Sequence, residues 1–111
     1  MDIQLSRDAD MVVCQIYKEY LKRIESGTPK ADAKIFKDVD GFIKTYFPNM
    51  DKMDFVDILS ELRQTLNLRI YVNASFQLSN EAIIYMENRF KNGTKQILDW
   101  LGKIKGIIPF V

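Results

Sequence analysis

The sequence predicts a mainly α-helical chain with one small β-hairpin. Apolar residues recur at three- and four-residue spacing along most of its 111 residues, and only one short stretch alternates apolar with polar residues. The length is typical of one domain, and contents of 47% hydrophobic and 28% charged residues are typical of a globular protein. We therefore expect a single domain over residues 1–111. Its elements should follow the order helix, helix, helix, strand, strand, helix, and then a C-terminal helix.

A first amphipathic helix is expected at about residues 8–26. Asp8 and Asp10 suit the N-terminus of a helix, and Gly27 followed by Pro29 suits its end. Charged residues occupy the opposite face from the apolar stripe. The stripe consists of Val13, Ile16, Tyr17, Tyr20, Leu21 and Ile24.

Two further helices are expected before the hairpin. The apolar residues of 35–46 keep a helical period, although Gly41 inside this stretch costs about 1 kcal/mol relative to Ala and signals the close approach of another element. The next helix should span about residues 51–66, with Asp51 as its N-cap. Its apolar stripe consists of Phe55, Ile58, Leu59, Leu62 and Leu66.

The period then changes from helical to alternating. Residues 68–72 alternate and are rich in β-branched and aromatic types, which predicts a strand. A turn at 73–74 would return the chain through a second strand at 75–78. Ser79 is a suitable N-cap for a fourth helix that ends near residue 92.

The segment that leaves the hairpin resembles the wing exit of many bacterial winged-helix proteins. That pattern is an aromatic residue, any residue, Leu, Thr or Ser, two more residues and then Gly before an apolar helix. Phe76, Leu78 and Ser79 match it, whereas Ala82 stands where Gly is usual. The chain is similar over residues 8–91 to winged helix-turn-helix domain proteins, including the small YjcQ-like proteins of Gram-positive bacteria and their phages. The resemblance implies a winged-helix core whose third helix enters the DNA major groove and whose hairpin is the wing.

The resemblance also implies a function, namely a non-catalytic DNA-binding transcriptional regulator with double-stranded DNA as its partner. The residues expected to contact DNA are Lys52, Arg63 and Gln64 of the third helix and Arg69 of the hairpin. Further candidates lie around the second helix, at Lys30, Lys34, Lys37 and Lys44.

The charge of the third helix opposes this expectation. Residues 51–66 hold two basic and four acidic side chains, so the segment carries a net charge of −2, which phosphate repels. The alternative is a protein-interaction or assembly module that keeps the winged-helix scaffold and does not bind DNA.

A C-terminal amphipathic helix is expected at residues 93–108. Its apolar set is too broad for one narrow seam, so we expect it to pack on the first helix or to form a homodimer with the same helix of a second subunit. A membrane surface is the less favoured partner. The residues expected at this interface are Ile97, Trp100, Leu101, Ile104 and Ile108.

The inventory of reactive side chains argues against an enzyme. Histidine is absent, Cys14 is the single cysteine, and no nucleophile–base pair or metal-loop spacing occurs, so neither a cofactor nor a metal is expected. Cys14 lies within the first helix and is expected to be buried and inert. The lone cysteine, the lack of a signal-peptide pattern and the lack of an apolar run of about 18 residues predict a cytoplasmic protein.

Overall fold

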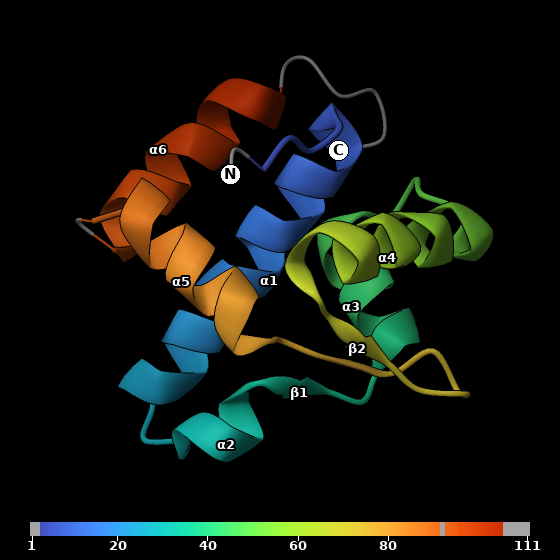
Figure 1. Cartoon of the computed structure of the whole chain (residues 1–111), viewed down its shortest axis with the longest axis horizontal. Helices are drawn as coiled ribbons and strands as arrows, with labels where there is room; N and C mark the ends of the chain where they lie inside the picture. The colour runs from blue at the N-terminus through green and yellow to red at the C-terminus, as the bar shows by residue number, and fades with distance from the viewer. Residues whose placement is uncertain (1–2, 92, 106–111) are drawn as a thin grey trace.

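The fold is mainly helical with a small three-stranded antiparallel sheet, as shown in the computed structural model, which describes residues 3–91 and 93–105. The helices are α1 (Arg7–Glu25), α2 (Lys30–Ala33), α3 (Val39–Tyr46), α4 (Lys52–Leu66), α5 (Asn80–Arg89) and α6 (Thr94–Lys105). The strands are β1 (Ile35–Phe36), β2 (Arg69–Ile70) and β3 (Phe76–Gln77). Helix α1 lies between α5 and α6 on one side and α3 and α4 on the other (Figure 1).

Helix α1 is the central element, and the structure confirms its predicted position. The hydroxyl of Ser6 accepts the backbone N–H of Ala9 at 3.2 Å and caps the helix, while Asp8 and Asp10 lie in its first turn. The run from Met11 to Tyr17 is buried on all sides because helices cover α1 on several faces. Gly27 ends the segment with a φ of 95°, a left-handed conformation that suits glycine.

The prediction of one continuous helix over residues 35–46 is wrong at its start. Ile35 and Phe36 form β1, and helix α3 begins only at Val39, where the carboxylate of Asp38 accepts the N–H of Gly41 at 3.0 Å. The β-branched and aromatic types of Ile35 and Phe36 favour a strand, and pairing with β3 outweighs the helical period. A side chain at residue 41 would collide with the Asp38 carboxylate, which explains the glycine.

The expected two-stranded hairpin is therefore part of a three-stranded sheet with the order β1-β3-β2. Phe36 pairs with Phe76, and Phe76 pairs with Ile70, so these three residues form the row that faces the core. The neighbouring row of Ile35, Gln77 and Arg69 lies on the opposite face. The strands are shorter than the predicted 68–72 and 75–78.

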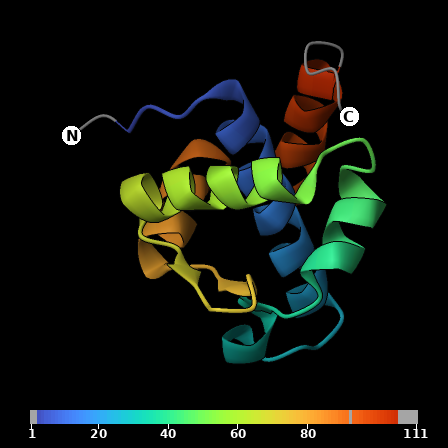
Figure 2. The same cartoon turned by 90° about the vertical axis from the view of Figure 1, so that its right-hand side faces the viewer.

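Helix α4 confirms the prediction for residues 51–66. The carboxylate of Asp51 caps it by accepting the N–H of Met53, and Asn67 ends it with a φ of 59°. The predicted stripe is buried, and its residues are Phe55, Ile58, Leu59, Leu62 and Leu66. Figure 2 shows α4 crossing the face toward the viewer, above the β2–β3 hairpin.

Helices α5 and α6 close the core on the other side of α1. The guanidinium of Arg89 in α5 makes a bidentate ion pair with the Asp10 carboxylate, one arm of which measures 2.9 Å. Ile97 and Leu101 of α6 are buried among the core residues of this chain. The predicted helix 93–108 is described as far as residue 105.

Replacing Leu62 by Ala should lower the free energy of unfolding by about 2–5 kcal/mol, because the leucine side chain is fully buried under α4. Urea denaturation measures the change. Gln64→Ala, on the exposed side of the same helix, is the control and should change stability by no more than about 0.5 kcal/mol. Equal midpoints for the wild type and Leu62→Ala would contradict the packing described for α4.

Candidate nucleic-acid interface

The face of α4 that points away from the core carries Met53, Asp57 and Gln64. These residues are spaced four and seven positions apart, so they form one line opposite the buried stripe. Met53 is 76% exposed. This line is therefore apolar at Met53 and acidic at Asp57, toward the N-terminus of α4, and neutral and polar at Gln64, toward its C-terminus.

The two flanks of α4 differ in charge. On one flank, the carboxylate of Glu61 accepts the N–H and the hydroxyl of Ser6, each at 2.8 Å, so this flank faces the segment before α1. On the other flank, Lys52 forms an ion pair with Asp40 of α3 at 2.9 Å. Arg63 lies about three turns beyond Lys52 on the same side of the helix. The basic residues of α4 therefore lie on the opposite flank from Glu61.

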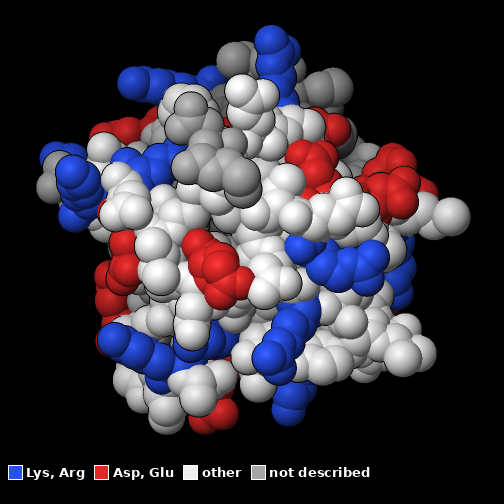
Figure 3. All heavy atoms as spheres, viewed as in Figure 1, with Lys and Arg blue, Asp and Glu red and all other residues white. Residues whose placement is uncertain are grey.

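The structure separates the four residues predicted to contact DNA into two groups. Lys52 is held by Asp40. Arg63, Gln64 and Arg69 are exposed, and neither arginine has an ion pair with any residue in the described ranges 3–91 and 93–105. Figure 3 shows Lys and Arg side chains in a broken band over the sheet and the adjoining end of α4, with Asp and Glu side chains above it. Three predicted residues thus lie at the C-terminal end of α4 and on the sheet that follows.

Arg69 lines a polar depression of about 210 Å³ on the outer face of the sheet. Within it, the ammonium of Lys34 donates to the side-chain oxygen of Asn80 at 3.2 Å, and the amide of Asn67 donates to the carboxylate of Glu81 at 2.6 Å. The residues that line the depression are Lys34, Asn67, Arg69, Gln77, Leu78, Ser79, Asn80 and Glu81.

Sequence reasoning named Lys34 and Arg69 of this depression and missed its amides. Gln77 could have been found, because it alternates with Phe76 and Leu78 in the predicted strand and must point away from the core. Asn67 and Asn80 had no such signal. Asn67 follows α4 and Asn80 begins α5, so only the tertiary structure brings these two residues together beside the sheet.

The hairpin tip adds exposed side chains without positive charge. Residues 71–75 contain no Lys or Arg, Tyr71 is half-exposed, and Val72 is fully exposed. Ala74 has a φ of 67°, a conformation that lets its N–H donate to the carbonyl of Tyr71 at 2.9 Å and closes the turn. The cations near the sheet lie at the base of the hairpin and not at its tip.

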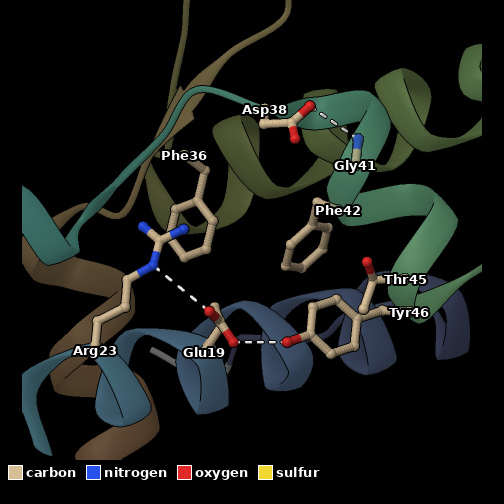
Figure 4. A pocket seen from close by; sticks show the side chains of 8 residues that line it. All are labelled: Glu19, Arg23, Phe36, Asp38, Gly41, Phe42, Thr45 and Tyr46. Carbon is tan, nitrogen blue, oxygen red and sulfur yellow. Dashed lines mark hydrogen bonds and ion pairs between the residues drawn. The ribbon is translucent and has the colours of Figure 1, made fainter. Parts of the chain in front are cut away.

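A second depression, of about 230 Å³, lies between α1, β1 and α3 (Figure 4). The guanidinium of Arg23 stacks over the ring of Phe36 at 4.2 Å and donates to the carbonyl of Ile35 at 2.8 Å. Glu19 pairs with Arg23 at 3.6 Å and accepts the hydroxyl of Tyr46 at 2.6 Å. The side chains of Glu19, Arg23 and Tyr46 are thus paired with one another and with β1. They form a brace that joins α1 to β1 and to α3.

Burial raises the pKa of several groups in the core, Cys14 and Tyr46 among them. Burial and the neighbouring Asp10 carboxylate raise the pKa of the Cys14 thiol, which is fully buried in α1, so the thiol stays protonated. Burial and the hydrogen bond to Glu19 raise the pKa of Tyr46 to about 12.

The interface residues predicted for the C-terminal helix are divided by the structure. Ile97 and Leu101 are buried in the core of this chain, which leaves neither side chain for a second subunit, and Trp100 is half-buried against the same core. The side chain of Ile104 and the whole of Ile108 lie outside the described residues. Leu98 of α6 is 48% exposed. A homodimer through this helix stays a prediction, and among the described side chains Leu98 and the exposed edge of Trp100 are available to it.

Among the described residues, no cluster of three or more metal-ligating side chains occurs, and no helix combines the length and apolar character needed to cross a membrane. Comparison of the chain with protein-family models, with curated proteins and with solved structures found no significant match. The function must therefore be argued from the surface itself.

Replacing Tyr46 by Phe should weaken the dependence of stability on alkaline pH. The hydroxyl of an unfolded chain loses its proton near pH 10, whereas the folded chain keeps it to about pH 12. The unfolded state therefore binds fewer protons in this window, and stability falls as pH rises from about 10 to about 12. The pKa values of Tyr17 and Tyr20 are also raised by burial, so part of the slope should persist.

Thermal unfolding measured in steps across this window tests the prediction. Glu19→Gln keeps an acceptor for the Tyr46 hydroxyl but removes its charge, and it should give a slope between those of the wild type and Tyr46→Phe. An alkaline slope in Tyr46→Phe as steep as in the wild type would contradict the raised pKa of Tyr46, and with it the burial of this hydroxyl beside Glu19.

Proposed function

We propose that this chain is a non-catalytic winged-helix module that binds double-stranded DNA and regulates transcription. The order α1, β1, α3, α4, β2, β3 and the sheet order β1-β3-β2 support a winged helix. In such a module α4 is the recognition helix and the β2–β3 hairpin is the wing. Both elements lie on the face turned toward the viewer in Figure 2.

The observation that carries the proposal is that Arg63, Gln64 and Arg69 are exposed and that neither arginine has an ion pair within residues 3–91 and 93–105. Arginine reads guanine and binds phosphate with a fork of donors, and glutamine reads adenine, so these types suit the major groove and the backbone beside it. Lys52, already paired with Asp40, contributes less.

The acidic residues of α4 set the orientation of the proposed complex. Glu61 is engaged by Ser6 on the flank away from the sheet, whereas Asp54 and Asp57 are exposed in the N-terminal half of the helix. Phosphate repels these two carboxylates, although Asp can accept the amino group of cytosine in the groove. The backbone should therefore run past the C-terminal end of α4 and the base of the hairpin.

Fluorescence anisotropy of a labelled duplex titrated with the protein tests the proposal. The logarithm of the affinity should fall linearly with the logarithm of the salt concentration, with a slope of about −0.9 for each phosphate contacted. Arg63→Gln should weaken binding and reduce the slope by about 1. Lys95→Gln, which removes the same charge from an exposed position on α6, is the control and should bind as the wild type does. Absence of binding at low salt would overturn the proposal.

A protein-interaction module is the second candidate, and exposed apolar side chains favour it. Met53 at the start of α4 and Val72 at the hairpin tip are large apolar residues left in solvent, with Asp54 and Asp57 beside the methionine. Met53→Lys separates the two functions. It adds a positive charge to the helix face, so it should strengthen DNA binding in the first case and abolish a protein contact centred on Met53 in the second.

A further inference from the structure

The outer-face depression presents hydrogen-bond donors because the oxygen atoms of two of its amides are already used. The hydroxyl of Tyr71 donates to the side-chain oxygen of Gln77 at 2.9 Å, and Lys34 donates to that of Asn80 at 3.2 Å. These contacts leave the NH₂ group of each amide, for which the described part of the chain offers no acceptor. Donors without acceptors suit an anion.

Two cations border the same depression. The N–H of Leu78 donates to the carbonyl of Lys34 at 3.0 Å, which holds the lysine backbone against the end of β3, and its ammonium keeps further donors after the bond to Asn80. Arg69 lies in the row of Gln77 on the outer sheet face, and its guanidinium has no carboxylate partner within residues 3–91 and 93–105. Lys34, which directly precedes β1, and Arg69 of β2 therefore both border the depression.

One carboxylate opposes them. Glu81 lines the depression and accepts the amide of Asn67 at 2.6 Å, which turns one of its oxygens toward the end of α4. Two cations and one carboxylate leave a net charge of +1. The Glu81 carboxylate therefore lowers the affinity for an anion. Removing its charge should raise that affinity, whereas removing the charge of Lys34 should lower it.

We propose that this depression, bordered by Lys34, Arg69, Gln77, Asn80 and Glu81, is a phosphate site. The inference rests on the proposed function for the source of the phosphate, which is then a backbone phosphate beside the segment contacted by α4. The same donors would take the phosphate of a free compound if the chain does not bind DNA. A phosphate bound in this depression would explain why the cations near the sheet lie at the base of the hairpin and not at its tip.

The test compares duplex binding, by anisotropy at several salt concentrations, among the wild type and three variants. Lys34→Gln should lower the affinity about two- to fivefold and reduce the salt slope by about 0.9. Glu81→Gln should raise the affinity by a similar factor. Lys95→Gln removes the same charge from an exposed side chain on α6, outside the depression, and should bind as the wild type does.

A second measurement separates the two sources of phosphate. Inorganic phosphate is titrated into the ¹⁵N-labelled wild type against chloride at equal ionic strength, and the site predicts shifts of the amide signals of residues 77–81 that Lys34→Gln reduces. DNA binding with equal affinities for Lys34→Gln and Lys95→Gln overturns the phosphate site and leaves the proposed function standing. No DNA binding, with the predicted shifts by inorganic phosphate, overturns the proposed function and supports the site for a free phosphate compound. No DNA binding and no shifts overturn both.

Discussion

The structure depends on a cluster of phenylalanine rings that joins the sheet to the helices. Phe36 of β1 and Phe76 of β3 stack with their centroids 4.9 Å apart, and Phe42 of α3 meets Phe36 edge-on at 5.7 Å. Phe55 of α4 lies 6.0 Å from Phe76. Strands of two residues supply few ladder hydrogen bonds, so the burial and packing of these rings hold the sheet in place.

The brace around Arg23 completes this arrangement from the side of α1. Its guanidinium lies over the ring of Phe36 and donates to the carbonyls of Ala33, at the end of α2, and of Ile35, in the edge strand β1. The first strand is thereby fixed to α1 at its edge and to β3 through the ladder. Because Lys34 directly precedes this strand, its position beside the outer face of the sheet is fixed as well.

The surface that results has two electrostatic parts. The N-terminal half of α4 exposes carboxylates and a methionine. Its C-terminal end and the sheet expose two arginines that pair with no carboxylate of the described residues, and a lysine held by an amide. The net charge of −2 for residues 51–66 does not reveal these two parts. It counts Glu61, which is bound to Ser6, and Lys52, which is paired with Asp40, as if both were free to meet a partner. Long-range attraction to an anionic partner would favour the end of α4 next to the hairpin.

The sequence by itself determined the helices α1 and α4, the hairpin and the caps at Asp51 and Ser79. Apolar periodicity and capping are local properties, so they can be seen in a single chain. It also showed that Arg63, Gln64 and Arg69 belong to the exposed faces of their elements, because each falls outside the apolar pattern.

Only the tertiary structure decided that Ile35 and Phe36 form a strand, since their helical spacing is overruled by pairing with β3, in which Phe36 pairs with Phe76, 40 residues away in sequence. The same holds for Ile97 and Leu101, whose apolar character does not say whether α1 or a second subunit covers them. The depression at Lys34 and Asn80 likewise forms from three separate segments. Long-range contacts of this kind depend on which surfaces meet in space, and no local pattern in the sequence records that.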